Sequence, residues 1–300
     1  MIRRFIAFVR AFFARLFGRV ERPGYFVKGS AAALLGQVVV APFLPPSREY
    51  LVYVPRNYGG LKRHTLIVFI HGCKQTPEEF AAGTRIAALA DTKGWIVLMP
   101  RQTERANRFG CWNWFDPQTS AGRGEAAIVL AQIKSVQRQF RVDKHHIVAA
   151  GFSSGGALAA ALGIRHPRRF AGVFVHSGIA CEAAHLPSSA YDVMARGART
   201  DPAGIGRKAR ASSGAIRLPM LAVHGEDDEV VALINGEQVA EQFRALNGEG
   251  HQGEDLAPLV KVPKLAHAWS GGDGAYPFND PKGPDATAML GEFVERLRGN

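Results

Sequence analysis

The sequence is poor in cysteine and contains no cofactor-binding motif that fits its context. Its 300 residues include three cysteines, and these form neither a CxxC pair nor a zinc-ligand spacing. No glycine-rich phosphate loop with a lysine is present. A G-x-G-x-x-G pattern at residues 248–253 follows an expected helix instead of a strand, which argues against a dinucleotide site. We therefore expect no cofactor and no metal.

Acidic residues are also scarce relative to basic ones. There are 26 Asp and Glu against 37 Lys and Arg, which gives a formal net charge of +11. Such an excess favours attraction to an anionic surface. The chain nevertheless lacks a zinc-finger, RRM-like or helix-turn-helix signature, and its arginines are spread over several loops. We therefore expect no nucleic-acid partner, and nothing in the sequence indicates an oligomeric state.

Residues 1–24 form a segment of their own that lacks an uninterrupted apolar run long enough to span a membrane. Apolar side chains recur there at helical spacing, and five arginines fall on the other side: Arg3, Arg4, Arg10, Arg15 and Arg19. These charges recur too often for a membrane span or a clear signal peptide. We expect a basic amphipathic helix at 1–24 that lies, through residues 1–22, on a membrane or hydrophobic particle. The alternative is a helix packed against the enzyme body or a partner.

Residues 25–300 are expected to form one large domain, in which apolar strands alternate with helices. Strands are expected at 37–40, 50–54, 66–70, 95–100, 147–150, 170–175, 220–223 and 259–262. Helices are expected at 77–92, 125–140, 157–163, 236–246 and 285–297. Strands that are apolar along their whole length predict a mainly parallel sheet with helices on both faces. Residues 101–119 read as a long aromatic loop. Residues 187–216 lack periodicity, as an insertion over the site or a flexible excursion would.

One strand runs into the sequence Gly151-Phe152-Ser153-Ser154-Gly155, and an alanine-rich helix follows. This G-x-S-x-G pattern between a strand and a helix predicts a nucleophile elbow, a sharp turn that exposes the serine hydroxyl above the sheet. A serine needs a base within hydrogen-bond reach, and the base needs a carboxylate that orients it. Ser153 is therefore the candidate nucleophile.

The acid and the base are expected later in the chain, in the order serine, acid, histidine. Four acids occupy 226–229 at the end of an expected strand, and spacing alone does not separate Asp227 from Asp228. His267 follows the next strand and is the candidate base. Three other histidines each end a strand and are expected to be structural: His71, His176 and His224.

The same loops are expected to complete the site. Two backbone N–H groups should stabilise a developing oxyanion, and the candidates are those of Ser154 and Cys73. Four aromatic residues are expected to line an acyl or polymer groove, with a buried structural role as the alternative: Trp112, Trp114, Phe115 and Trp269. Cys73 and Cys111 both lie in loops near this site. They either form a disulfide or remain free thiols.

Five motifs in order carry a family resemblance: His71–Gln75, Cys111–Phe115, Gly151–Gly156, His224-Gly225 with Asp228, and His267–Gly272. Together they resemble the esterase family of polyhydroxybutyrate depolymerases, which includes feruloyl and acetyl-xylan esterase relatives. The resemblance implies an α/β-hydrolase fold and an acyl-enzyme mechanism. It also implies Ser153 as nucleophile, His267 as base and Asp228, not Asp227, as the acid.

The resemblance also implies a substrate and a compartment. The expected substrate is a polyhydroxybutyrate-type polyester or a short hydroxyacid ester, and the alternative is a feruloyl or acetyl-xylan ester. The family is mostly secreted, which implies an extracellular protein. The basic helix in place of a clear signal peptide leaves a membrane-peripheral or intracellular protein as the alternative. The rival from another class is a non-catalytic protein that coats membranes or storage granules.

Overall fold

The computed structural model describes residues 23–34, 37, 47–59, 61–214, 216–248 and 255–298. Except for its last two residues, the amphipathic helix expected at 1–24 lies outside the described residues. The strand expected at 37–40 does so too, except for Gln37, which belongs to a 3-10 turn. Neither prediction is tested by the structure.

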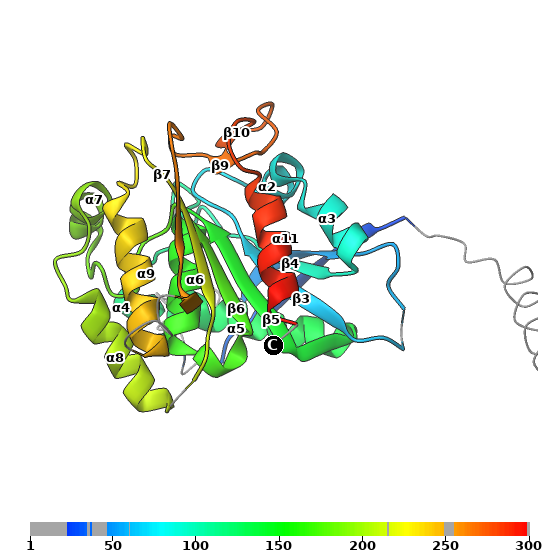
Figure 1. Cartoon of the computed structure of the whole chain (residues 1–300). Helices are drawn as coiled ribbons and strands as arrows, with labels where there is room; N and C mark the ends of the chain where they lie inside the picture. The colour runs from blue at the N-terminus through cyan, green and yellow to red at the C-terminus, as the bar shows by residue number, and fades with distance from the viewer. Residues whose placement is uncertain are drawn as a thin grey trace, which may run out of the picture.

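An eight-stranded sheet forms the centre of the described chain (Figure 1). Its order is β1-β2-β4-β3-β5-β6-β7-β8. The strands are β1 Tyr25–Ala32, β2 Ser47–Val54, β3 His64–Ile70, β4 Ile96–Pro100, β5 Val142–Phe152, β6 Gly172–His176, β7 Met220–Gly225 and β8 Leu259–Val262. Only β2 runs antiparallel to its neighbours β1 and β4, and the pairs from β4 to β8 are parallel. The predicted mainly parallel sheet is confirmed.

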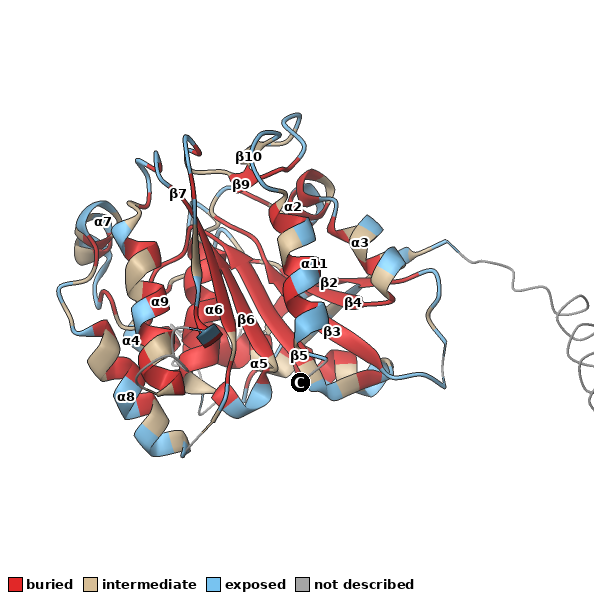
Figure 2. Ribbon diagram, in the orientation of Figure 1, coloured by how far each residue is buried: buried red, intermediate tan, exposed pale blue. Residues whose placement is uncertain are grey.

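Helices cover both faces of this sheet. The helices are α2 Pro77–Thr84, α3 Ile86–Lys93, α4 Pro117–Ser120, α5 Gly124–Gln139, α6 Ser154–Arg165, α7 Pro187–Arg196, α8 Pro202–Ser213, α9 Ile234–Asn247 and α11 Ala286–Arg296. Side chains of β3 alternate between the faces, as strand geometry requires. Leu66 and Val68 pack in the core shared with α5, α6 and α9, whereas Ile67 and Phe69 pack in the core shared with α2 and α11. Figure 2 shows the strands buried between helices whose outer sides are exposed.

The structure differs from the sequence prediction at several elements. The helix expected at 77–92 is two helices, because Arg85 between them has a φ of 56° and ends α2. The guanidinium of Arg85 is held by the carbonyl of Gly271 and the carboxylate of Asp285, 186 and 200 residues further along the chain. Residues 187–216 contain the helices α7 and α8 instead of irregular chain. Strand β1 was not predicted, because its side chains are half-buried or exposed and give no apolar run.

The turn between β5 and α6 is built by close backbone contacts. Ser153 has φ 55° and ψ −122°, a conformation that residues with a side chain rarely adopt. A Cβ on Gly155 would lie 2.2 Å from the carbonyl oxygen of Ile70, and one on Gly151 would lie 2.2 Å from that of Gly155. The N–H of Ser153 donates to the carbonyl of His176 at 2.9 Å. The strand ends of β3, β5 and β6 therefore fix the serine.

We predict that Gly155→Ala destabilises the protein by at least about 2 kcal/mol, because the new methyl group must displace backbone that has no alternative position. Chemical denaturation followed by circular dichroism measures the change. Gly59→Ala is the matched control, since a Cβ there meets nothing within 4 Å. Equal stability of the two variants would contradict the close packing described above.

Candidate active site

Three side chains from distant parts of the chain meet above the sheet. His267 Nε2 lies 2.9 Å from Ser153 Oγ, and His267 Nδ1 lies 2.7 Å from Asp228 Oδ2. Ser153 follows β5, Asp228 lies in the loop after β7, and His267 lies between β8 and Trp269. This arrangement lets Nδ1 carry a proton toward the carboxylate, so that Nε2 accepts the serine proton.

The structure distinguishes between the two candidate acids. Asp228 is buried, whereas Asp227, Glu226 and Glu229 are exposed. The second carboxylate oxygen of Asp228 accepts hydrogen bonds from the N–H groups of Val230 and Val231, at 3.0 and 2.8 Å. Burial by itself would raise the pKa of Asp228. The hydrogen bond to His267 and the N–H of Val231 outweigh burial and leave that pKa below its usual value.

Two further histidines lie beneath this group as neutral, buried side chains. His224 Nε2 donates to the carbonyl of Val231 at 2.7 Å and so supports the Asp228 loop. His176 stacks on Trp269 at 5.0 Å between ring centroids, and its Nε2 accepts from the N–H of Ser270 at 3.2 Å. Desolvation lowers the pKa of both and that of His176 to about 3. The predicted structural role of these histidines agrees with their burial and their contacts.

Residues 71–75, which we name the oxyanion strap, lie against Ser153, the candidate nucleophile. A Cβ on Gly72 would lie 3.2 Å from the Cβ of Ser153. The N–H of Gly72 donates to the side chain of Gln75, and no hydrogen bond between described residues uses the N–H of Cys73. The N–H of Ser154 has no acceptor within its own helix, because it is the first residue of α6. Both candidate donors are thus beside Ser153.

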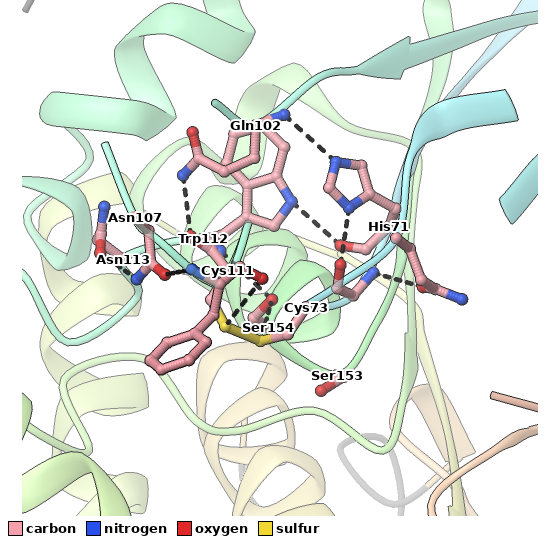
Figure 3. Close-up of a disulfide and its surroundings, with 12 residues drawn as sticks. His71, Cys73, Gln102, Asn107, Cys111, Trp112, Asn113, Ser153 and Ser154 are labelled. Atoms are coloured by element: carbon pink, nitrogen blue, oxygen red, sulfur yellow. Dashed lines mark hydrogen bonds between the residues drawn. A yellow bond between two sulfur atoms is a disulfide. The ribbon is translucent and has the colours of Figure 1, made fainter. Parts of the chain in front are cut away.

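A disulfide joins the strap to the aromatic loop. Cys73 and Cys111 are bonded, which decides between the two states that the sequence left open. Figure 3 shows the bridge next to Ser153 and Ser154, with the indole of Trp112 above it in the view. The third cysteine, Cys181, is a buried free thiol, and burial raises its pKa to about 11.

The four aromatic residues expected in a substrate groove fall into two groups. That expectation is wrong for Trp112 and Trp269, whose side chains have no exposed surface. Their indole N–H groups donate to His71 O and Thr287 Oγ1, both at 3.0 Å, so the rings support the site from within. Trp114 is 7% exposed, and the half-buried Phe115 packs edge-on against it. Only this second pair approaches the surface.

Sequence reasoning missed one polar residue at the site. Glu125, in the first turn of α5, is buried and accepts hydrogen bonds from the aromatic loop. The sequence offered one indication of this residue: an acidic side chain directly follows Gly122-Arg123-Gly124. From the sequence, Glu125 is expected only as the first residue of the helix at 125–140. The described residues contain no group of three or more histidine, cysteine, aspartate or glutamate side chains placed to hold a metal ion. Across the described ranges, every helix is too short or too polar to cross a membrane.

A comparison with protein families matches residues 48–253 to the family described as esterase PHB depolymerase. The chain belongs to this family. Among curated relatives, poly(3-hydroxyalkanoate) depolymerase C of Paucimonas lemoignei is 28% identical over 226 residues, which cover 74% of this chain and 54% of that protein. Feruloyl esterase B of Neurospora crassa is 27% identical over 197 residues, which cover 62% of this chain and 66% of that protein. The chain spans about half the length of the depolymerases it matches.

Solved structures agree on the fold. Acetyl xylan esterase from Aspergillus awamori superposes with a TM-score of 0.67 at 19% identity, covering 81% of this chain and 94% of that one. An S-formylglutathione hydrolase from Agrobacterium tumefaciens gives a TM-score of 0.60 at 16% identity, covering 91% and 96%. The predicted α/β-hydrolase fold is confirmed.

We predict that acid destabilises the folded chain through its buried histidines. Burial lowers the pKa of His71 to about 4 and that of His176 to about 3, from an ordinary value of 6.5. Below pH 6.5 these two histidines therefore bind protons in the unfolded chain but stay neutral in the folded chain. The free energy of unfolding falls as the pH drops from 6.5 toward 4. We expect a loss of about 1 kcal/mol or more per pH unit. Urea unfolding at pH 6.5, 5.5 and 4.5 measures it, and a constant free energy would contradict the prediction.

Proposed function

We propose that the protein is a serine carboxylester hydrolase that acts through an acyl-enzyme. The single observation that carries this proposal is the imidazole of His267, which lies within hydrogen-bonding distance of Ser153 Oγ on one side and of the buried Asp228 on the other. Membership of an esterase family supports the same reaction class. A protein that only coats membranes or granules would have no use for this arrangement.

In the proposed reaction, Ser153 Oγ attacks the ester carbonyl carbon while His267 Nε2 takes the hydroxyl proton. Asp228 keeps the imidazole in the correct tautomer and stabilises the imidazolium that forms. The N–H groups of Cys73 and Ser154 donate to the negative oxygen of the tetrahedral intermediate. The imidazolium then protonates the leaving alcohol, and a water molecule, deprotonated by His267, releases the acid.

The substrate that we propose first is a polyhydroxyalkanoate-type polyester or a short ester of a hydroxyacid. Support comes from the family match and from relatives that are depolymerases of poly(3-hydroxyalkanoate) and poly(3-hydroxybutyrate). A second candidate is a feruloyl or acetyl-xylan ester, because several relatives carry those activities in their names. Trp114 and Phe115 are the aromatic residues that we propose for contact with the acyl group, since they lie nearer the surface than Trp112 and Trp269.

For the triad, we predict that Ser153→Ala abolishes hydrolysis of p-nitrophenyl butyrate while the fold is retained. Asp228→Asn should lower kcat by about 10⁴-fold, because the amide favours the wrong imidazole tautomer. The matched control is Asp227→Asn, one residue away, whose exposed carboxylate touches none of the triad. Full turnover by the Ser153 variant would refute the mechanism, and an equal loss in both Asn variants would refute the assignment of Asp228.

For the substrate, we predict that the full chain clears an emulsion of polyhydroxybutyrate faster than it releases ferulate from methyl ferulate, at equal enzyme concentration. Turbidity and chromatography measure the two reactions. The Ser153→Ala variant is the blank in both. Ferulate release without clearing would replace the first substrate proposal by the second, and activity on neither would leave only the short esters.

A further inference from the structure

The buried carboxylate of Glu125 makes contacts that the reaction above does not use. Glu125 is 6% exposed. Its Oε2 accepts from the N–H of Asn113 at 2.7 Å, and its Oε1 accepts from the side-chain amides of Asn113 at 2.9 Å and Gln102 at 2.5 Å. Both oxygens are thus occupied by N–H donors of the aromatic loop. The side chain of Glu125 holds the two ends of the segment 102–113 together.

That segment carries the contacts that fix the oxyanion strap. Gln102 donates its backbone N–H to His71 Nε2 at 3.2 Å, and its side-chain amide also donates to the carbonyl of Cys111 at 3.0 Å. His71 Nδ1 in turn lies 2.7 Å from the carbonyl oxygen of Gly72. Gln102 therefore links Glu125 to the bridge through its side-chain amide and to the strap through its backbone N–H.

A second group of links runs through the residues between Gln102 and Asn113. The disulfide attaches Cys111 to Cys73, the strap residue that is proposed to donate to the oxyanion. Trp112 Nε1 donates to the carbonyl of His71 at 3.0 Å, and the N–H of Trp112 donates to Ser154 Oγ at 3.3 Å. Figure 3 shows Trp112 between His71 and Ser154, next to the bridge. Both proposed oxyanion donors are thereby tied to the loop that Glu125 anchors.

We propose that Glu125 is the positioning residue of the oxyanion hole: its carboxylate fixes the aromatic loop, and the loop fixes the N–H groups of Cys73 and Ser154. The inference rests on the proposed esterase function and extends it. Glu125 does not touch the reacting atoms. It orients the N–H groups of Cys73 and Ser154, which must point at the oxygen where negative charge develops in the transition state.

The role requires a carboxylate and not just a side chain of this size. All three donors that face Glu125 are N–H groups, so both of its oxygens must accept. A glutamine has the same shape but replaces one oxygen by NH₂, which faces another donor. Burial raises the pKa of Glu125, whereas the hydrogen bonds from Gln102 and Asn113 and the positive charge of Arg48 partly offset this rise and favour the carboxylate. A glutamine should therefore loosen the loop while leaving the helix intact.

The test compares Glu125→Gln with wild type in the full chain. We expect kcat for p-nitrophenyl butyrate to fall about ten- to a hundredfold, less than or equal to the loss of a whole oxyanion donor, with KM within about twofold. The second readout is inhibition by a trifluoromethyl ketone, whose adduct with serine carries a negative oxygen in the oxyanion hole. Its affinity should fall by the same factor as kcat/KM.

Glu237→Gln is the matched control. Glu237 also lies in the first turn of a helix, α9, and it pairs with Lys261 on the surface. We expect wild-type kinetics from this variant. Normal kcat in a folded Glu125→Gln protein would overturn the positioning role. A fall in kcat without loss of ketone affinity would also overturn it. Misplaced oxyanion donors must weaken the ketone adduct, so a loss of kcat that leaves the adduct unchanged has another origin.

Two further measurements distinguish failure of the positioning role from failure of the proposed esterase function. If Glu125→Gln does not fold, Gln102→Leu removes one donor to the carboxylate and must show the same parallel loss of kcat and ketone affinity; normal values there would overturn the inference. A wild-type chain that neither hydrolyses esters nor binds the ketone would overturn the proposed function itself. An active wild type with an unaffected Glu125→Gln variant would overturn only the positioning role.

Discussion

The site depends on one constraint of packing: three pieces of backbone meet where no side chain fits between them. The end of β3, the turn after β5 and the start of α6 touch through Gly151 and Gly155. This contact holds the strained Ser153 with its hydroxyl facing His267. The cost of that conformation, of order 1–3 kcal/mol, is offset by the buried sheet around it. The serine therefore needs no adjustment when a substrate arrives, because its position is set by the same core that stabilises the fold.

Much of the fold could be predicted from the sequence, because buried parallel strands carry an unmistakable apolar signal. The strands at Leu66–Ile70 and Met220–Val223 are examples, and every residue in both is buried. The sequence prediction failed where the local pattern of apolar and polar residues does not determine the secondary structure. The break at Arg85 depends on partners near the C-terminal end of the chain, and β1 is an edge strand whose side chains are all half-buried or exposed. The helices in 187–216 are short, with 10 and 12 residues, and each buries only a few small or apolar residues.

The candidate site shows the same division. Ser153 and His267 could be chosen from motif and order, since turn chemistry fixes the first and chain order the second. Asp227 and Asp228 could be separated only by resemblance, and in the structure the difference is burial, which two adjacent residues in a loop do not reveal in advance. Tryptophan is equally ambiguous in sequence, because an aromatic side chain suits a groove and a core alike. Glu125 was invisible for another reason: its partners are backbone and amide groups from a loop without periodicity.

The chain has one cysteine besides the bridged pair, Cys181, and a free thiol can exchange with a disulfide. Exchange between a thiol and a disulfide starts from the thiolate, and a thiol whose pKa lies near 11 is almost never ionised at neutral pH. Cys181 is also enclosed by packed side chains, with its sulfur directed at the carbonyl of Ser120. Scrambling of the bridge from within the same molecule is therefore suppressed once the domain has folded, and the correct pairing needs protection only while the chain is still open.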